Sequence, residues 1–104
     1  MSNIVSVNIN NYREEVSQSK IPVLVDFYAP WCGPCRQLNP VLEDIASENL
    51  DKFKIVKINI DEAIDLVTLF RVRSVPSLFV VKDGEVVNKI FHATKNNILT
   101  ALEN

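Results

Sequence analysis

The chain of 104 residues is long enough to bury one hydrophobic core and too short for a separate substrate domain, so we expect residues 1–104 to form a single domain. With 47% hydrophobic and 23% charged residues, its composition is that of a globular protein and excludes a disordered or fibrous chain. A formal net charge of -2 gives no electrostatic reason to expect nucleic acid as a partner.

The sequence also lacks the signals of a membrane or secreted protein. No apolar run approaches the length of a membrane span. The N-terminal residues Met1-Ser2-Asn3-Ile4 lack the basic segment, apolar stretch and small-residue cleavage site of a secretory signal. We therefore expect a cytoplasmic protein that does not bind membranes.

In chain order, the apolar periodicity first predicts a short strand at 4–7. Asn10 can then cap a helix over 12–19, which has polar residues in its first turn. The next segment, 22–28, is apolar on both alternating faces. This pattern is typical of a central strand that is covered on both sides.

The middle of the chain continues this alternation. After the cysteines, apolar residues recur at helical spacing, so Cys35 lies near the start of an amphipathic helix that runs to about Glu48. Residues 54–60 predict another strand. Asp61 can cap a helix that ends near Phe70.

The last third predicts a hairpin followed by a helix. Strands at 77–81 and 85–91 flank residues 82–84, a turn whose Asp-Gly pair tolerates positive φ. Thr94 then caps the final helix. The order βαβαβαββα predicts an α/β fold, in which a parallel core built by right-handed crossovers is completed by an antiparallel hairpin.

The two cysteines, Cys32 and Cys35, call for a catalytic or metal-binding role, because cytosolic reductants normally keep such thiols reduced. Residues three apart at a helix start can bring their Cβ atoms within disulfide range. Unpaired backbone N–H groups and the positive end of the helix dipole favour a thiolate there. Cys32 lies furthest toward that end, so we expect it to attack a disulfide and Cys35 to resolve the mixed disulfide.

Zinc, haem and a static disulfide each suit the cysteine pair less well. Structural zinc usually needs four Cys or His ligands, and the chain offers two cysteines and His92, so we expect no metal. Covalent haem needs a histidine directly after the second cysteine, where Arg36 stands. A static disulfide stays open, although so short a loop gains little from closure.

The segment Ala29-Pro30-Trp31-Cys32-Gly33-Pro34-Cys35 resembles the active site of the thioredoxin family. Val25-Asp26-Phe27 precedes it, and Pro40 follows in the next helix, as in that family. Further similar features follow in the family's order along almost the whole chain: Lys57, Val75-Pro76 and Asp83-Gly84. The resemblance implies the thioredoxin fold, a central mixed five-stranded sheet flanked by four helices.

The same resemblance implies a general protein-disulfide reductase that acts through Cys32 and Cys35. Gly33-Pro34 is the variant of reducing family members, whereas disulfide-forming isomerases and oxidases usually carry a histidine there. The implied partners are disulfide-containing client proteins and a flavin-containing, NADPH-dependent thioredoxin reductase. The chain itself would bind no cofactor and act as a monomeric redox carrier. A scaffolding subunit whose thiols do not turn over, and an oxidase or isomerase, remain the rival functions.

Two charged residues are expected to support the cysteines. Asp26 lies in a covered strand, where desolvation raises the pKa of a carboxyl, and the resemblance assigns it the proton of Cys35. Its alternative is a strand-end aspartate that reaches solvent. The resemblance places Lys57 beside Asp26 as a modulator of its charge, although lysines that flank strands are usually solvated.

A client-binding surface is implied around the motif, formed by Trp31, Gly33, Pro34, Val75 and Pro76. We expect Trp31 at the rim of the site, because its neighbours form a turn. X-Pro bonds are usually trans, but the resemblance implies a cis bond at Val75-Pro76 that holds Val75 next to the cysteines. An extended client segment could then pair with the free backbone of Val75.

The sequence departs from the family at Ser74 and His92, where thioredoxins generally have glycine. Both positions are expected in loops that border the client groove. The simpler interpretation of His92 is a solvated loop histidine. Our hypothesis is that His92 narrows the groove and, when charged at mildly acidic pH, favours the Cys32 thiolate.

Overall fold

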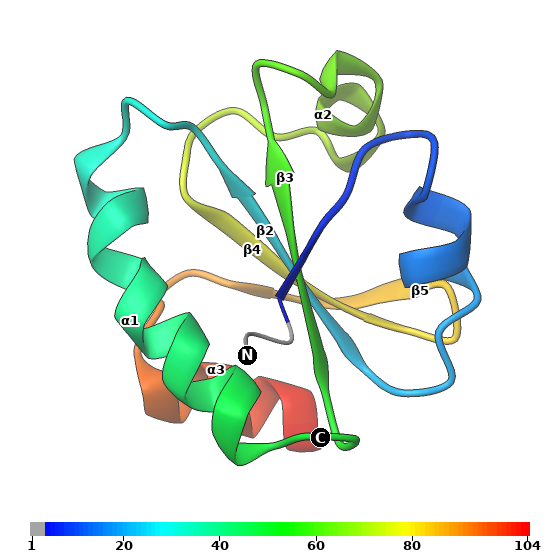
Figure 1. Cartoon of the computed structure of the whole chain (residues 1–104), viewed down its shortest axis with the longest axis vertical. Coiled ribbons are helices and arrows are strands. Elements are labelled where there is room, and N and C mark those ends of the chain that lie inside the picture. Colours follow the sequence, from blue (N-terminus) through cyan, green and yellow to red (C-terminus); the bar gives the residue numbers. More distant parts are fainter. Residues whose placement is uncertain (1–3) are drawn as a thin grey trace.

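A five-stranded mixed sheet forms the centre of the protein (Figure 1). The computed structural model describes residues 4–104, so the N-terminal Met1-Ser2-Asn3 segment considered above lies outside the described residues. The elements are β1 (Ile4–Ser6), η1 (Arg13–Ser17), β2 (Val23–Tyr28), α1 (Gly33–Glu48), β3 (Lys54–Asn59), α2 (Ile64–Phe70), β4 (Ser77–Lys82), β5 (Glu85–Ile90) and α3 (Lys95–Glu103). The predicted order of five strands and four helices is confirmed.

The strands lie side by side in the order β1-β3-β2-β4-β5. The neighbours β1, β3 and β2 are parallel, whereas β4 runs antiparallel to β2 and β5 antiparallel to β4. Asp83 and Gly84, with φ angles of 52° and 80°, make the tight turn between β4 and β5. The most apolar strand, β2, therefore lies at the centre of the sheet, where it is paired on both edges.

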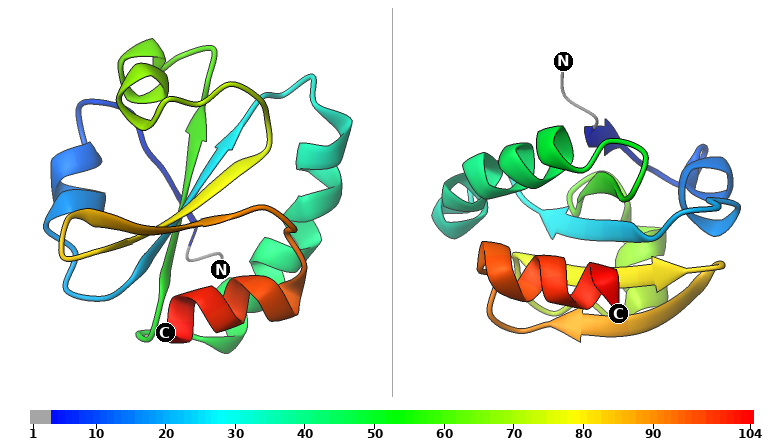
Figure 2. Two further views of the ribbon diagram at one scale, coloured as in Figure 1. Left: turned by 180° about the vertical axis from the view of Figure 1, so that it is seen from behind. Right: turned by 90° about the horizontal axis from the view of Figure 1, so that it is seen from below.

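Helices cover both faces of the sheet. Helices α1 and α3 pack on one face, and η1 and α2 lie on the other (Figure 2). Because successive side chains of a strand point to opposite faces, Leu24 joins the core under α1 and α3 while Val25 joins the other core. In the second core, Phe27, Phe70 and Phe79 pack ring against ring at centroid distances of 5.0 to 5.8 Å.

The first predicted helix differs from the observed one. The sequence predicts a helix over 12–19 capped by Asn10, but η1 is a five-residue π-helix whose N-cap position, Tyr12, makes no side-chain capping bond. The asparagines before it bond one another's backbone instead: Asn8 Oδ1 accepts from the Asn10 N–H at 2.8 Å. Asparagine competes with the helix for backbone groups in this way, so a local turn replaces the predicted cap.

The predicted start of the third helix, with Asp61 as its cap, is also wrong. Helix α2 begins at Ile64, after a turn, and has no side-chain cap. In contrast, the prediction for the last helix is confirmed, because Thr94 Oγ1 accepts from the Asn97 N–H at 3.1 Å. Among residues 4–104, no helix has the length and apolar character needed to span a membrane.

Candidate thiol–disulfide site

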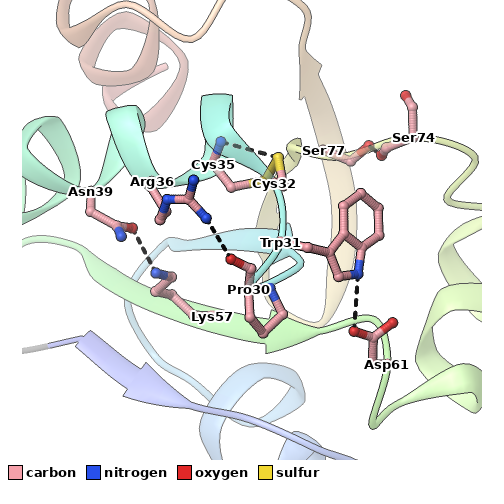
Figure 3. Close-up of a disulfide and its surroundings, with 10 residues drawn as sticks. All are labelled: Pro30, Trp31, Cys32, Cys35, Arg36, Asn39, Lys57, Asp61, Ser74 and Ser77. Atoms are coloured by element: carbon pink, nitrogen blue, oxygen red, sulfur yellow. Dashed lines mark hydrogen bonds between the residues drawn. A yellow bond between two sulfur atoms is a disulfide. The ribbon is translucent and has the colours of Figure 1, made fainter.

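Cys32 and Cys35 lie at the N-terminus of α1, directly after the loop that leaves the central strand β2 (Figure 3). Cys32 is the N-cap residue with extended backbone, and its Sγ accepts from the Cys35 N–H at 3.1 Å. Pro34 stands in the first turn, where helical N–H groups have no carbonyl partner and none is lost by a proline. The two sulfurs form a disulfide, and the Cα atoms are 5.3 Å apart.

The disulfide is sheltered by its surroundings. Cys32 is 6% exposed and Cys35 is 3% exposed. Both pack with buried Ala29, and the half-buried residues around them are Tyr28, Ile60 and Val75. A partner can therefore reach the sulfurs only by fitting against the surface around them.

Trp31 lies at the rim of the site, as predicted, and the residue is 65% exposed. Its indole Nε1 donates a hydrogen bond of 3.2 Å to Asp61 Oδ2 (Figure 3). Beside it is a hollow of about 330 Å³, lined by Trp31, Ile60, Val67, Val72, Arg73, Ser74 and Val75. Ser74 thus borders the site from the side of the indole, as its position in the sequence suggested.

The Val75-Pro76 peptide bond is cis, which confirms the prediction. Val75 packs against the cysteine cluster. On the far side of the motif, Pro76 lines a second hollow of about 270 Å³ together with Pro34, Gln37, Leu38, Val41 and Ala93. Two of the hollows around the cysteine motif are therefore partly formed by the loop before β4.

His92 lines neither of these two hollows. It is exposed and borders a separate hollow between β5 and α3 that includes Asn88 and Asn97. Its backbone carbonyl accepts from the Asn97 side-chain amide at 2.9 Å. The residue of this loop that borders the cysteine motif is the next one, Ala93.

Asp26 is fully buried in the middle of β2, so the alternative of a solvated strand-end aspartate is wrong. Both carboxyl oxygens lack a hydrogen-bond partner among the described residues. Burial raises the pKa of Asp26 to about 7, and the positive charge of Lys57 offsets part of this rise. The carboxyl can consequently gain and lose a proton near neutral pH.

Lys57 is the direct neighbour of Asp26 across the parallel β2–β3 pair. Its ammonium nevertheless bonds elsewhere: Nζ donates to Asn39 Oδ1 at 2.6 Å (Figure 3). The same nitrogen lies 4.3 Å from the centroid of the Tyr28 ring, a cation–π distance. Lys57 is half-buried rather than fully solvated.

Sequence reasoning missed two residues that hold site residues in place, Asn39 and Asp61. Asn39 stands four residues after Cys35 in α1, so the two share a helix face, and this spacing was the available signal. Asp61 has the residue type of a helix cap, and no local pattern links it to an indole thirty residues earlier. In residues 4–104, no group of three or more His, Cys, Asp or Glu side chains is placed to hold a metal ion.

Comparison with known proteins gives consistent matches along the chain. A family model described as Thioredoxin matches residues 3–104. The chain is 42% identical over 99 residues to Thioredoxin 1 of Synechococcus elongatus, covering 95% of this chain and 92% of that protein. It is 45% identical over 87 residues to Thioredoxin of Haemophilus influenzae, covering 84% and 81%. It is 42% identical over 99 residues to Thioredoxin M-type, chloroplastic, of Chlamydomonas reinhardtii, covering 94% and 71%.

Proposed function

The chain belongs to the thioredoxin family, and from this premise we propose that it is a general protein-disulfide reductase of broad client range. Family membership and the paired cysteines make it a thiol–disulfide oxidoreductase. The observation that carries the proposal is the placement of Cys32 and Cys35 at the start of α1, where the pair closes without unfolding any element. A flavin-containing, NADPH-dependent thioredoxin reductase would return the disulfide to the dithiol.

In the proposed reaction, the Cys32 thiolate attacks one sulfur of a client disulfide. The client S–S bond breaks, a mixed disulfide forms with Cys32, and the other client sulfur leaves as a thiolate that takes up a proton. The N–H of Cys35 already points at the Cys32 sulfur and would stabilise its negative charge. The dipole of α1, a helix of sixteen residues, acts in the same direction.

Cys35 then attacks the Cys32 sulfur and releases the second client thiolate, so two electrons pass to the client and the Cys32–Cys35 disulfide forms. We assign Asp26 the role of general base that takes the proton of Cys35. A base works best when its pKa is near the working pH, and burial raises the pKa of Asp26 to about 7. Lys57 would modulate this proton affinity through its charge.

Client proteins would bind over Trp31, Gly33, Pro34, Val75 and Pro76. Two features support this assignment: the exposed indole of Trp31 and the two hollows that flank the cysteines. An extended client segment would pair with the backbone of Val75, so that main-chain bonds common to many clients give the affinity.

His92 is proposed as a further member of the client surface, because its loop neighbour Ala93 lines the hollow beside Pro34 and Pro76. In this role, its side chain narrows the groove and, when protonated, favours the Cys32 thiolate. The comparison of His92→Gly with wild type tests it. Identical thiol titration curves and identical client rates in the two proteins would remove His92 from the site.

We further propose that the protein acts as a cytoplasmic monomer of one domain, residues 1–104. Its partners would be disulfide-containing client proteins in general and the reductase. Size-exclusion chromatography with light scattering measures the oligomeric state. A stable dimer in the reduced protein would contradict the monomer.

The deciding experiment is NADPH-coupled reduction of insulin with the cognate reductase. Wild type should turn over, Cys32→Ser should not, and Cys35→Ser should stop after one step as a mixed disulfide with the client. A dithiothreitol-driven assay separates the client reaction from recognition by the reductase. If wild type reduces insulin in neither assay, the reductase function is wrong and the scaffolding function takes its place.

A further inference from the structure

Lys57 and Asp26 form an unusual pair, because they are opposite in charge and adjacent in the sheet yet do not bond. They are Cα partners in the parallel β2–β3 pair. Both occupy strand positions that alternate onto the α1 face of the sheet, since Leu24 and Ile55, two residues before each, pack in the core under α1. Even so, no ion pair joins them among residues 4–104, and Asp26 accepts no hydrogen bond.

The partners of the Lys57 ammonium account for this separation. Nζ donates to Asn39 Oδ1 at 2.6 Å and lies 4.3 Å from the Tyr28 ring centroid. Asn39 comes from α1 and Tyr28 from the last position of β2. The two residues thus hold the ammonium near the end of the strand, two positions beyond Asp26.

We propose that Asn39 is a positioning residue of the thiol–disulfide site, which holds the Lys57 ammonium against Tyr28 and out of contact with Asp26, so that the buried carboxylate keeps a high enough affinity for a proton to take the one that Cys35 gives up. The inference rests on the proposed reductase function for its role in turnover. The placement of Lys57 itself does not depend on that function.

The chemistry of an amide suits this task. Asn39 Oδ1 accepts a hydrogen bond from the ammonium without neutralising it, because the amide carries no charge. The positive charge of Lys57 therefore still acts on Asp26 from a distance and offsets part of the effect of burial on its pKa. A direct Asp26–Lys57 ion pair would instead favour the carboxylate strongly.

Among the cations near Asp26, Lys57 is the one whose charge lowers the pKa of the carboxyl against the larger effect of burial. Arg36 lines the same hollow of about 270 Å³ as Cys35, Asn39 and Lys57, but its Nη1 donates to the Pro30 carbonyl at 2.8 Å. On the other edge of β2, the residue opposite Asp26 is the uncharged Leu78 of β4.

The remaining groups near Asp26 are uncharged near neutral pH or act at a distance. Cys32 and Cys35 are joined in the disulfide form. The Tyr28 hydroxyl has a raised pKa, chiefly from burial and then from the charges of Glu62 and Asp26. The hydroxyl is therefore neutral near neutral pH, and the charge of Glu62 acts on Tyr28.

The test is the titration of Asp26 in the oxidised protein, followed by the ¹³C signal of its carboxyl. In Asn39→Ala the ammonium is released and can approach Asp26, so the titration midpoint should fall by about one pH unit. Asn39→Gln keeps an amide oxygen and should restore much of the wild-type midpoint. Ser47→Ala removes an exposed polar group from the same helix, far from Lys57, and should leave the midpoint unchanged.

A double-mutant cycle shows whether Asn39 acts through Lys57. Lys57→Met should raise the midpoint, and adding Asn39→Ala to Lys57→Met should then change nothing. An unchanged or raised midpoint in Asn39→Ala, or an equal fall in the Lys57→Met background, would overturn the proposal.

The titration and the insulin assays distinguish a failure of the role proposed for Asn39 from a failure of the reductase function. The titration needs no client protein and no reductase, so a shift in Asn39→Ala together with inactivity in the insulin assays would remove only the function. If both hold, the pH profile of client release should move in Asn39→Ala by the same amount as the Asp26 midpoint.

Discussion

The indole Nε1 of Trp31 donates a 3.2 Å hydrogen bond to the carboxylate of Asp61, and this bond joins the loop before α1 to the turn before α2. The Asp61 backbone is held in turn, because its N–H donates to Asn59 Oδ1 at 2.9 Å. The most exposed aromatic ring beside the cysteines is therefore attached to the end of β3. Loss of this attachment should change how the indole meets a client without unfolding the protein.

We therefore predict that Asp61→Ala releases the Trp31 ring. The bond is exposed, so the free energy of unfolding should fall by no more than about 1 kcal/mol. Insulin reduction should slow by about threefold. The released Trp31 ring must be ordered again each time a client binds, at a free-energy cost of similar size. Trp31 is the single tryptophan of the chain, so fluorescence reports its environment alone.

Asp61→Asn is the matched control for this prediction, since it keeps an oxygen that can accept from the indole. Its emission maximum and insulin rate should lie between those of wild type and Asp61→Ala. If Asp61→Ala leaves both the emission and the rate at the wild-type values, the attachment has no part in client binding.

The burial of Asp26 predicts a specific dependence of stability on pH. In the unfolded chain its carboxyl ionises near pH 3.8, and burial raises the folded pKa to about 7. Between these values the folded protein holds a proton that the unfolded chain has lost, so the free energy of unfolding falls as pH rises. Over this window, Asp26 alone should remove about 4 kcal/mol of stability, and above pH 7 the loss is complete.

Urea unfolding of the oxidised protein at pH 4, 5.5 and 8 measures this effect. Asp26→Asn has no carboxyl to ionise at this position, so its free energy of unfolding should not show this fall with rising pH. At pH 8 its free energy of unfolding should be about 2 to 4 kcal/mol higher than that of wild type. At pH 4, where Asp26 is neutral in the fold, the two proteins should be similar. Parallel pH curves for the two proteins would show that Asp26 does not titrate with a raised pKa.

The cap of the last helix gives a prediction about stability alone. Thr94 Oγ1 accepts from the Asn97 N–H at 3.1 Å, so Thr94→Ala should cost about 1 kcal/mol of unfolding free energy. The adjacent Lys95 makes an exposed ion pair with Glu48 of α1. Lys95→Ala should leave stability nearly unchanged, because solvent screens such pairs. A larger loss in Lys95→Ala than in Thr94→Ala, measured by urea unfolding, would reverse this assignment.

Elements with long apolar patterns could be predicted from the sequence, because burial requires the pattern. Strand β2 and helix α1 each bury a continuous set of apolar side chains, and their predicted positions differ from the observed ones by at most two residues. The predictions for short segments were wrong where a polar side chain could bond to more than one partner. Asn10 and Asp61 are both residue types that cap helices, and each lies in a turn just before a helix, where tertiary contacts or neighbouring asparagines decide its role.

In the candidate site, too, features that follow from a local apolar pattern could be predicted, and features that depend on tertiary packing could not. The burial of Asp26 follows from its place in an apolar strand, so its raised pKa could be expected from the sequence. The bond between Lys57 and Asn39 could not, because it joins residues eighteen apart through the packing of α1 over β3. The hollow that His92 borders likewise could not be predicted, because it is formed together with residues of β5 and α3 that one loop sequence does not specify.

The two glycines of the chain should respond oppositely to alanine. A Cβ on Gly33 would meet nothing within 4 Å, whereas a Cβ on Gly84 would lie 3.1 Å from the Ser17 carbonyl oxygen, and Gly84 has a φ of +80°. Gly84→Ala should therefore lose about 1 to 2 kcal/mol of stability, since an L residue is strained in this conformation. Gly33→Ala should keep wild-type stability or gain up to about 1 kcal/mol, because alanine restricts the unfolded chain.

For Gly33, the contrast separates folding from client binding. If the open space above this residue is where the client approaches, Gly33→Ala should raise the KM for insulin by a few-fold while the urea midpoint stays at or above the wild-type value. Gly84 lies in the β4–β5 turn, away from the cysteines, so Gly84→Ala should lower the urea midpoint and leave the KM of the folded protein unchanged. A wild-type KM in Gly33→Ala would mean that clients do not approach over Gly33. Gly33 would then no longer belong to the residues proposed to bind clients.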